Sequence, residues 1–249
     1  MSETSSYLAE AREAFNLACP SKEPVSLFSQ RQWDDALCAN VLQELINSST
    51  SAKDRARLLA VSTRESSYWL QALPSKHIGT LLDHLTLTIT VGLRLGARIQ
   101  QPHLCHCGET VDVYGHHSLA CAKSAGRFSR HASLNGVIRR SLVTAKVPAV
   151  LEPNGLARSD GKRPDGMTLV PWKQGRSLVW DATCVDTLAL SHIQVTSVAA
   201  GTAATKAERA KRRKYENIEN NFIFVPFGVE TMGSWGEDAR SFFKDLRSA

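Results

Sequence analysis

The stretch MTLVPWKQGRSLVWDATCV, residues 167–185, contains two apolar runs separated by a turn. The runs are MTLV (167–170) and SLVWDATCV (177–185), and the turn centres on Lys173–Gly175. Short runs rich in β-branched and aromatic residues, joined by a few residues that include glycine, are typical of a β-hairpin. We therefore predict two adjacent strands in this part of the chain.

The segments around this hairpin predict one α/β unit over residues 127–249. From the spacing of apolar residues we expect, in order, a helix over 127–146, a strand over 147–153, a long basic helix over 199–220, a strand over 222–229 and a helix over 236–246. Pro226 in the last strand indicates a sheet edge or a bulge, because proline cannot donate a ladder hydrogen bond. With the hairpin, the predicted order is αβββαβα.

Residues 1–100 are predicted to form a mostly helical region. The patterns favour one helix over 34–47 and a second over 51–73, which ends before Pro74. The first helix carries an apolar stripe formed by Leu37, Val41, Leu42, Leu45 and Ile46. The stretch 85–95 instead alternates leucine, isoleucine and valine with threonine, glycine and arginine, and this period of two favours a strand.

The composition excludes several classes of protein. Hydrophobic residues make up 43% of the 249 residues, close to the average of globular proteins, so the chain is not wholly disordered. No run approaches the roughly 18 apolar residues that a membrane span needs. The N-terminus lacks the basic and apolar parts of a secretory signal. We therefore expect an intracellular protein with no membrane partner.

The charge distribution favours a nucleic-acid partner. The formal net charge is +6, and the stretch KAERAKRRKY (206–215) contains six basic residues and a single acidic one. Clustered lysine and arginine neutralise phosphates, which is the electrostatic signature of nucleic-acid binding. A solvated helix face is the alternative interpretation of this stretch. The same basic run also matches the weak pattern of a nuclear localisation signal.

The run CHCGETVDVYGHHSLAC (105–121) predicts a metal site. Zinc takes four cysteine or histidine ligands in a tetrahedron, and three cysteines with one histidine supply them. The candidate cysteines are Cys105, Cys107 and Cys121, and the candidate histidines are His103, His106, His116 and His117. Four protein ligands leave no open position for chemistry, so the expected role is structural. The alternative is a chance grouping of free cysteines and surface histidines.

Three carboxylates are candidates for a second metal site. Asp165 lies in KRPDG, Asp181 lies in VWDAT, and Glu152 ends the preceding strand. In a hairpin, Asp165 and Asp181 can point to the same end of one face, where two acids hold Mg²⁺ for phosphodiester hydrolysis. Lys211 or Lys206 of the basic helix would stabilise the phosphate. The alternatives are a salt bridge for Asp181 and a turn role for Asp165.

Six motifs in a fixed order resemble the C-terminal region of non-LTR retrotransposon polyproteins. They are the CxC…HxxxC knuckle, GR..RH (Gly126, Arg127, Arg130, His131), RPDG, WDAT, KxxKY (Lys211, Lys214, Tyr215) and PFGVET (226–231). The relatives in question carry a restriction-enzyme-like endonuclease of the PD-(D/E)XK class after the reverse transcriptase. Upstream, RARLLA, WLQALPSKHIG and VGLRLGARI resemble the segment that joins the polymerase thumb to the knuckle.

The resemblance implies three parts and a mixed α+β or α/β fold. Residues 1–100 would be a helical region like the thumb and linker, 101–126 a zinc knuckle, and 127–249 a PD-(D/E)XK-like αβββαβ core with a mixed sheet. It also implies a helix over 81–95, against the alternating pattern. No F/Y-x-D-D polymerase signature is present, so we expect a fragment, a degenerate copy or a derived gene.

The resemblance also implies roles for individual residues. Asp165 and Asp181 would bind Mg²⁺, and His117 would be the zinc ligand in place of His116. The third motif reads Asp181-Ala182-Thr183 and lacks its usual lysine, which in these relatives is taken to have moved to the next helix, where Lys211 fits best. The residues expected to face nucleic acid are Arg130, His131, Arg163, Lys206 and Lys214.

The implied activity is a DNA endonuclease that nicks its target, so that the exposed 3′ end primes reverse transcription. The expected partners are DNA and element RNA, and the expected location is the nucleus. The missing lysine supports an alternative, in which the chain is a non-catalytic zinc-containing module that binds nucleic acid. A third interpretation is an inactive retrotransposon remnant.

Overall fold

The computed structural model describes residues 3–20, 30–156, 163–218 and 221–247, and the chain divides into two units after Ser51. The first unit contains helices α1 (Glu3–Ala18) and α2 (Gln30–Ser48). These helices contact each other through the rings of Phe15 and Trp33, whose centroids lie 5.2 Å apart. The helix predicted over 34–47 is confirmed. Of its apolar stripe only Ile46 is buried, while three members are exposed, namely Leu37, Val41 and Leu45.

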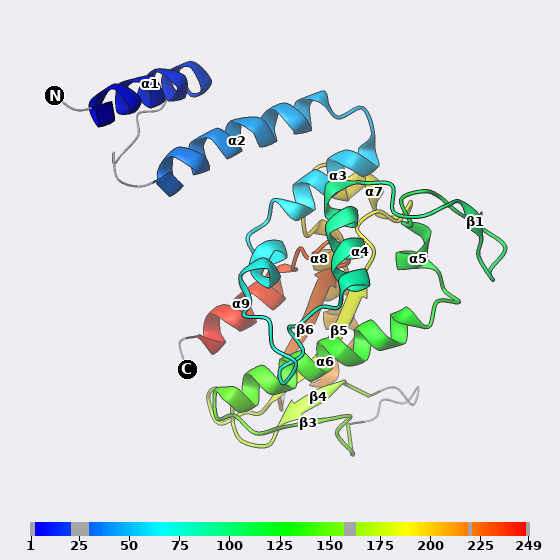
Figure 1. Cartoon of the computed structure of the whole chain (residues 1–249). Coiled ribbons are helices and arrows are strands. Elements are labelled where there is room, and N and C mark those ends of the chain that lie inside the picture. Colours follow the sequence, from blue (N-terminus) through cyan, green and yellow to red (C-terminus); the bar gives the residue numbers. More distant parts are fainter. Residues whose placement is uncertain (1–2, 21–29, 157–162, 219–220, 248–249) are drawn as a thin grey trace. The chain divides into compact units, whose positions relative to one another are not determined.

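The second unit is built on a mixed four-stranded sheet (Figure 1). Its strands are β3 (Ala149–Leu151), β4 (Gly166–Thr168), β5 (Leu178–Val185) and β6 (Ile223–Glu230), in the spatial order β3-β4-β5-β6. The β3/β4 and β4/β5 pairs are antiparallel and the β5/β6 pair is parallel. The predicted hairpin is therefore confirmed. Strand β6 lies at the sheet edge, a position that a strand containing Pro226 can occupy.

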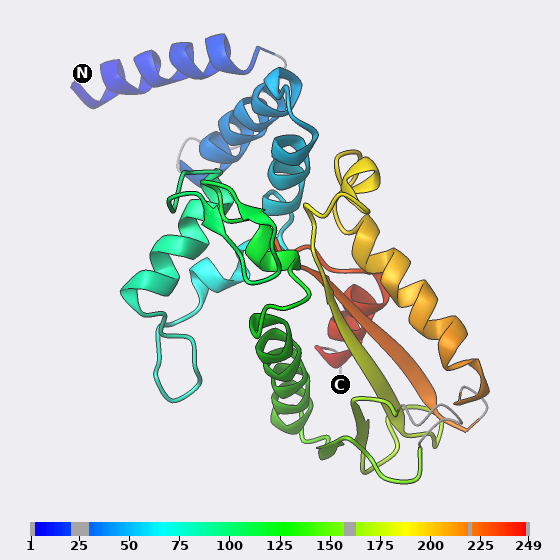
Figure 2. The same cartoon turned by 90° about the vertical axis from the view of Figure 1, so that its right-hand side faces the viewer.

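Helices cover both faces of this sheet (Figure 2). On one face, α6 (Gly126–Thr144) and α9 (Glu237–Leu246) enclose a core around Leu142, Trp180, Phe227 and Phe242. On the other, α8 (Thr202–Lys214) leads into the buried Tyr215, which packs with Val179 and Phe224. Successive β5 side chains point to opposite faces, as strand geometry requires. The sequence-predicted order αβββαβα is confirmed.

The basic helix is shorter than predicted. Helix α8 ends at Lys214 and is followed by the 3₁₀ turn η2 (Glu216–Ile218), whereas the prediction extended over 199–220. The last two predicted residues, 219–220, lie outside the described residues. Before α8, the short helix α7 (Ile193–Thr196) continues the crossover between the parallel strands β5 and β6.

Two predictions for the helical region need correction. The helix expected over 51–73 divides into α3 (Ala52–Val61) and the 3₁₀ helix η1 (Glu65–Gln71). The alternating stretch 85–95 is α4 (His84–Leu95), so the strand that its period favoured is wrong and the helix implied by the resemblance is confirmed.

Local hydrogen bonds explain why α4 is a helix. The Asp83 side chain caps its first turn by accepting from the Thr86 N–H at 2.9 Å, and Gly96 ends it with φ of 68°. Threonine side chains in the alternating stretch form hydrogen bonds within the helix, because the Thr88 and Thr90 hydroxyls donate to carbonyls four residues earlier. The caps at Asp83 and Gly96 therefore favour a helix more strongly than the alternating apolar pattern favours a strand.

Short regular elements occur in the knuckle, where none was predicted. Strands β1 (His103–Leu104) and β2 (Thr110–Val111) form an antiparallel pair, and α5 (His117–Ala120) follows. Leu119 of α5 packs against a buried cluster that contains Ala60 of α3 and Met232, which follows β6. The knuckle is thus packed against the rest of the second unit. None of the helices within the described ranges combines the length and apolar character that a bilayer crossing requires.

A buried glutamate on α8 joins three elements of the second unit. Glu208 accepts hydrogen bonds from the N–H groups of Gly228, Asp238 and Ala239, each at 3.0 Å. Two of these groups belong to the first turn of α9, where a carboxylate also interacts favourably with the helix dipole. Burial raises the pKa of the Glu208 carboxyl above its ordinary value.

We expect Glu208→Ala to lower the free energy of unfolding by at least about 3 kcal/mol, because three buried N–H groups lose their acceptor. Urea denaturation followed by circular dichroism measures this change. Glu216→Ala is the matched control, since Glu216 is exposed on η2. A Glu208 variant as stable as this control would contradict the role assigned to the buried carboxylate.

Candidate functional site

Asp165 and Asp181 lie at the same end of the β4/β5 hairpin. The register pairs Gly166 with Trp180, so Asp165 directly precedes this pair on one strand and Asp181 directly follows it on the other. The Asp165 N–H donates to the Trp180 carbonyl at 2.9 Å, which holds the loop before β4 against β5. The structure therefore places the two aspartates that the sequence singles out opposite each other at the same end of neighbouring strands.

The Asp165 carboxylate occupies a position beside β5 that is largely shielded from water. Its Oδ2 atom accepts a hydrogen bond from the Ala182 N–H at 2.7 Å and lies 3.0 Å from Nε2 of His131. Burial, and secondarily the negative charge of Asp181, raises the pKa of the Asp165 carboxyl. Two carboxylates that repel each other in this way are stabilised by a bound cation.

Asp181 forms an ion pair with the basic helix. Its side chain is 5% exposed, and Nζ of Lys211 lies 2.5 Å from its Oδ1 atom. Lys211 reaches it from α8, which packs across this face of the sheet. The salt bridge that was the alternative interpretation of Asp181 is therefore present, and its partner is the lysine that the resemblance selects.

Lys206 lies on a different face of α8 from Lys211. It lines a cavity of about 580 Å³ with Arg209 and Arg213. Five positions along a helix turn a side chain by about 140°, which separates the two lysines. Of the two lysines considered for phosphate stabilisation, the structure thus brings only Lys211 to Asp181.

Glu152 does not join the two aspartates. Its carboxylate pairs with Arg163, and its side chain is 68% exposed. Only its backbone contributes to the hairpin, by donating its N–H to the Asp165 carbonyl at 2.8 Å. The prediction of Glu152 as a third acid is therefore not supported by its contacts. Its partner Arg163 is one of the residues expected to face nucleic acid.

Arg130 and His131 are adjacent on α6 but contact different parts of the protein. His131 contacts Asp165, whereas Nη2 of Arg130 donates to the Leu119 carbonyl at 2.7 Å and so ties α6 to the knuckle. Both residues, with Arg127 and Phe128, line a cavity of about 360 Å³ that extends to Thr183 of β5. Of these lining residues, His131 is the one that also contacts Asp165.

Lys214, also expected to face nucleic acid, lies beside Tyr215. Its Nζ atom is 4.8 Å from the centre of the Tyr215 ring. The Tyr215 hydroxyl in turn donates to the Arg163 carbonyl at 3.1 Å. Lys214 is thus near the segment that leads into Asp165.

Asn135 is a supporting residue that the sequence reasoning missed. It is buried one turn after His131, and its Nδ2 atom lies 3.4 Å from Nδ1 of His131. Its Oδ1 atom accepts from Nε1 of Trp180 at 3.0 Å. These contacts fix the ring that touches Asp165. In the sequence, Asn135 is a polar residue at a helical position where the pattern otherwise places apolar residues. This exception could have identified it as a site residue.

The four predicted zinc ligands converge in the knuckle. The ligand atoms of Cys105, Cys107, His117 and Cys121 all lie within 4.8 Å of one another. The Cys105 and Cys121 sulfurs are 3.7 Å apart, close to the edge of about 3.8 Å that a tetrahedron with Zn–S distances of about 2.3 Å requires. The cluster can therefore hold a zinc ion. Within the described residues, no other group of three or more potential ligands converges in this way.

The structure distinguishes the adjacent histidines. Nε2 of His117 lies 3.1 Å from the Cys107 sulfur, whereas the His116 ring stacks on Tyr114 with centroids 5.6 Å apart. Burial lowers the pKa of His116, so this ring is neutral near pH 7. Of the other candidates, His103 contacts the Gln101 carbonyl, and neither it nor His106 is in the cluster.

The environment of Cys105 favours a metal ligand. Hydrogen bonds from the Cys107 backbone and the His117 side chain lower the pKa of the Cys105 thiol to about 6. At neutral pH this sulfur is therefore mostly a thiolate, the form that binds metal. Gly108 has φ of 95°, a left-handed conformation that allows the tight turn between Cys107 and β2.

Comparisons with known proteins give no match. A scan against models of known protein families finds none that matches this chain, and a search of curated proteins finds no similar sequence.

Proposed function

We propose that residues 127–249 form a metal-dependent DNA endonuclease of the restriction-enzyme-like class, related to the one that follows the reverse transcriptase in non-LTR retrotransposon polyproteins. The observation that carries this proposal is the placement of Asp165 and Asp181 at one end of the β4/β5 hairpin, with Lys211 on Asp181. An αβββαβ order with a mixed sheet supports it.

Asp165 and Asp181 would hold Mg²⁺. When bound, this ion polarises the scissile phosphate and lowers the pKa of an attacking water. His131, held by Asn135, fixes the orientation of the Asp165 carboxylate. Lys211 supplies a positive charge next to Asp181, where it can stabilise the negative charge that develops on the phosphate.

Basic residues around this site would bind the DNA backbone. Arg127, Arg130 and His131 line one cavity, and His131 also contacts Asp165. Lys214 lies over the ring of Tyr215, whose hydroxyl donates to the Arg163 carbonyl. In the proposed role the protein nicks target DNA in the nucleus, and the new 3′ end primes reverse transcription of element RNA. A structural zinc ion in the Cys105–Cys107–His117–Cys121 cluster would hold the knuckle against α6.

One observation favours a second candidate function. The ion pair between Lys211 and Asp181 neutralises the carboxylate without a metal, as expected if the site only supports a fold that binds nucleic acid. In that case the protein binds DNA, with an affinity that falls steeply with salt, but does not cleave it.

A plasmid assay separates the two candidates. Supercoiled DNA is incubated with the zinc-loaded protein, with and without Mg²⁺, and relaxed circles are quantified on a gel. The endonuclease proposal expects relaxed circles only with Mg²⁺. Salt-dependent binding without any relaxed circles would reject it in favour of the binding module.

A further inference from the structure

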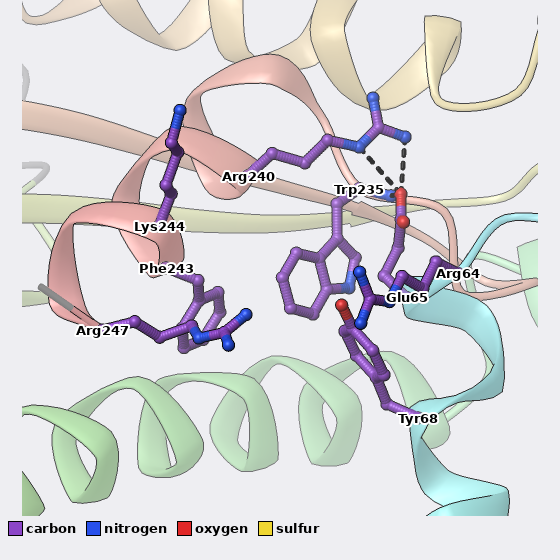
Figure 3. Close-up of a pocket in the computed structure, with 8 residues that line it drawn as sticks. All are labelled: Arg64, Glu65, Tyr68, Trp235, Arg240, Phe243, Lys244 and Arg247. Atoms are coloured by element: carbon purple, nitrogen blue, oxygen red, sulfur yellow. Dashed lines mark hydrogen bonds and ion pairs between the residues drawn. The ribbon is translucent and has the colours of Figure 1, made fainter.

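A second site of different composition lies between η1 and α9. A cavity of about 770 Å³ is lined there by three aromatic residues, four cationic ones and one acid (Figure 3). None of the lining residues belongs to the carboxylate site or the knuckle. The proposed nuclease function therefore leaves this cavity without a role.

The aromatic residues form a partly open wall. Trp235 lies at its centre, with the Phe243 ring 4.8 Å away and the Tyr68 ring 6.0 Å away, measured between centroids. Figure 3 shows Tyr68 pointing toward Trp235 from the side of η1. Tyr68 is 42% exposed, so its ring remains accessible to a ligand. A planar apolar ligand can stack on such rings.

The charges in this cavity favour an anion. Its acid, Glu65, is already engaged, since it accepts from Nε and Nη2 of Arg240 at 2.8 and 2.5 Å. Arg64 and Arg247 are exposed, and neither forms an ion pair with any residue that the structure describes. Both side chains extend toward the aromatic wall in Figure 3, while Lys244 points away from it.

We propose that this cavity binds an unpaired nucleotide of single-stranded nucleic acid. The base would stack on Tyr68 and Trp235, and Arg64 and Arg247 would bind the adjoining phosphates. Stacking on aromatic rings combined with phosphate contacts to basic side chains is the chemistry by which proteins hold single strands. A duplex does not offer an unstacked base to this wall. The proposal stands independently of cleavage at Asp165 and Asp181.

Fluorescence anisotropy tests it with the full chain in a buffer without Mg²⁺. The probes are a labelled oligothymidylate and a labelled oligouridylate, which report DNA and RNA strands separately. Tyr68→Leu is expected to weaken binding of at least one probe about fivefold to a hundredfold, because the stacking surface is lost. Tyr68→Phe keeps the ring and should bind as the wild type does.

Matched variants make the result specific. Tyr7→Leu removes an exposed tyrosine outside the cavity and should leave affinity unchanged. Arg64→Ala with Arg247→Ala should weaken binding and flatten its salt dependence, whereas Arg139→Ala, an exposed arginine of α6, should not. Tyr68→Leu should also leave the affinity for a duplex unchanged.

Three outcomes would overturn the proposal. They are failure of the wild type to bind either probe, equal affinity of Tyr68→Leu and wild type, and equal weakening of single-strand and duplex binding by Tyr68→Leu. Loss of nicking in an Asp165 variant that still binds both probes would leave the proposal intact, so the two functions fail separately.

Discussion

Asp165→Asn and Asp181→Asn are each expected to lower Mg²⁺-dependent nicking of supercoiled DNA by at least about a thousandfold. A metal ion contributes several kcal/mol to the stabilisation of the transition state, and about 1.4 kcal/mol corresponds to a factor of ten in rate. Each substitution removes one of the two charges that would hold the ion, while an amide of almost the same size preserves the packing around it. The measurement is the initial rate of relaxed-circle formation.

Binding must be measured on the same variants. DNA affinity, determined by anisotropy on a duplex, should change little in Asp165→Asn, because this carboxylate is not expected to contact the DNA backbone. Asp34→Asn is the matched control, since Asp34 is exposed on α2 and belongs to the other unit. Nicking by Asp165→Asn at the rate of this control would exclude the carboxylate pair as the catalytic site.

Asp181→Asn also tests the ion pair. Removal of this charge leaves Lys211, whose side chain is 26% exposed, without the partner that lies 2.5 Å away. Loss of one partner of a buried pair is destabilising because the other charge is left uncompensated, although the partial exposure of Lys211 reduces this effect. Urea denaturation of Asp181→Asn and Asp165→Asn should therefore show the larger loss of stability for Asp181→Asn.

His117→Ala is expected to abolish stable zinc binding, whereas His116→Ala should retain one zinc ion per chain. The two residues are adjacent, but only His117 places a ring nitrogen in the cysteine cluster. Loss of a direct ligand should lower zinc affinity by more than the 10- to 100-fold that loss of a supporting hydrogen bond to a ligand typically costs. Elemental analysis gives the stoichiometry, and competition with a chromogenic chelator gives the affinity.

Zinc loss should also destabilise the second unit. The knuckle contacts the rest of this unit through Leu119 and through the hydrogen bond from Arg130, so its unfolding would remove both contacts. The melting temperature of His117→Ala should therefore fall, and Cys107 and Cys121 should become reactive toward alkylating agents. Equal zinc content in the two histidine variants would contradict the assigned ligand set.

Much of the second unit could be predicted from local patterns. The hairpin over 167–185, the helix over 127–146 and the closing helix all follow from the spacing of apolar residues, because each element buries one face. The three cysteine ligands within 105–121 follow from the pattern, since clustered cysteines are rare, whereas the choice of His117 among the candidate histidines came only from the resemblance. The convergence of the four ligands in space was a prediction that the structure confirms.

The errors have physical causes. Alternation over 85–95 predicted a strand, but threonine hydroxyls can bond within a helix and the caps at Asp83 and Gly96 fix both ends. The single helix over 51–73 divides because the chain turns after Val61 and continues as η1. The apolar stripe of α2 remained largely exposed, since periodicity shows which residues share a face but not what covers them.

The sequence by itself determined the element order over residues 127–249, the ligand types of the knuckle and the two aspartates at the open end of the hairpin. These are local properties, set by the period of apolar residues and by the chemistry of neighbouring side chains. The resemblance favoured Lys211, but only the tertiary structure showed that this lysine contacts Asp181. Only the tertiary structure also decided that Glu152 turns to Arg163, and that η1 and α9 enclose an aromatic and basic cavity. Such contacts join residues far apart in the chain, and they depend on how whole elements pack against one another, which no local pattern specifies.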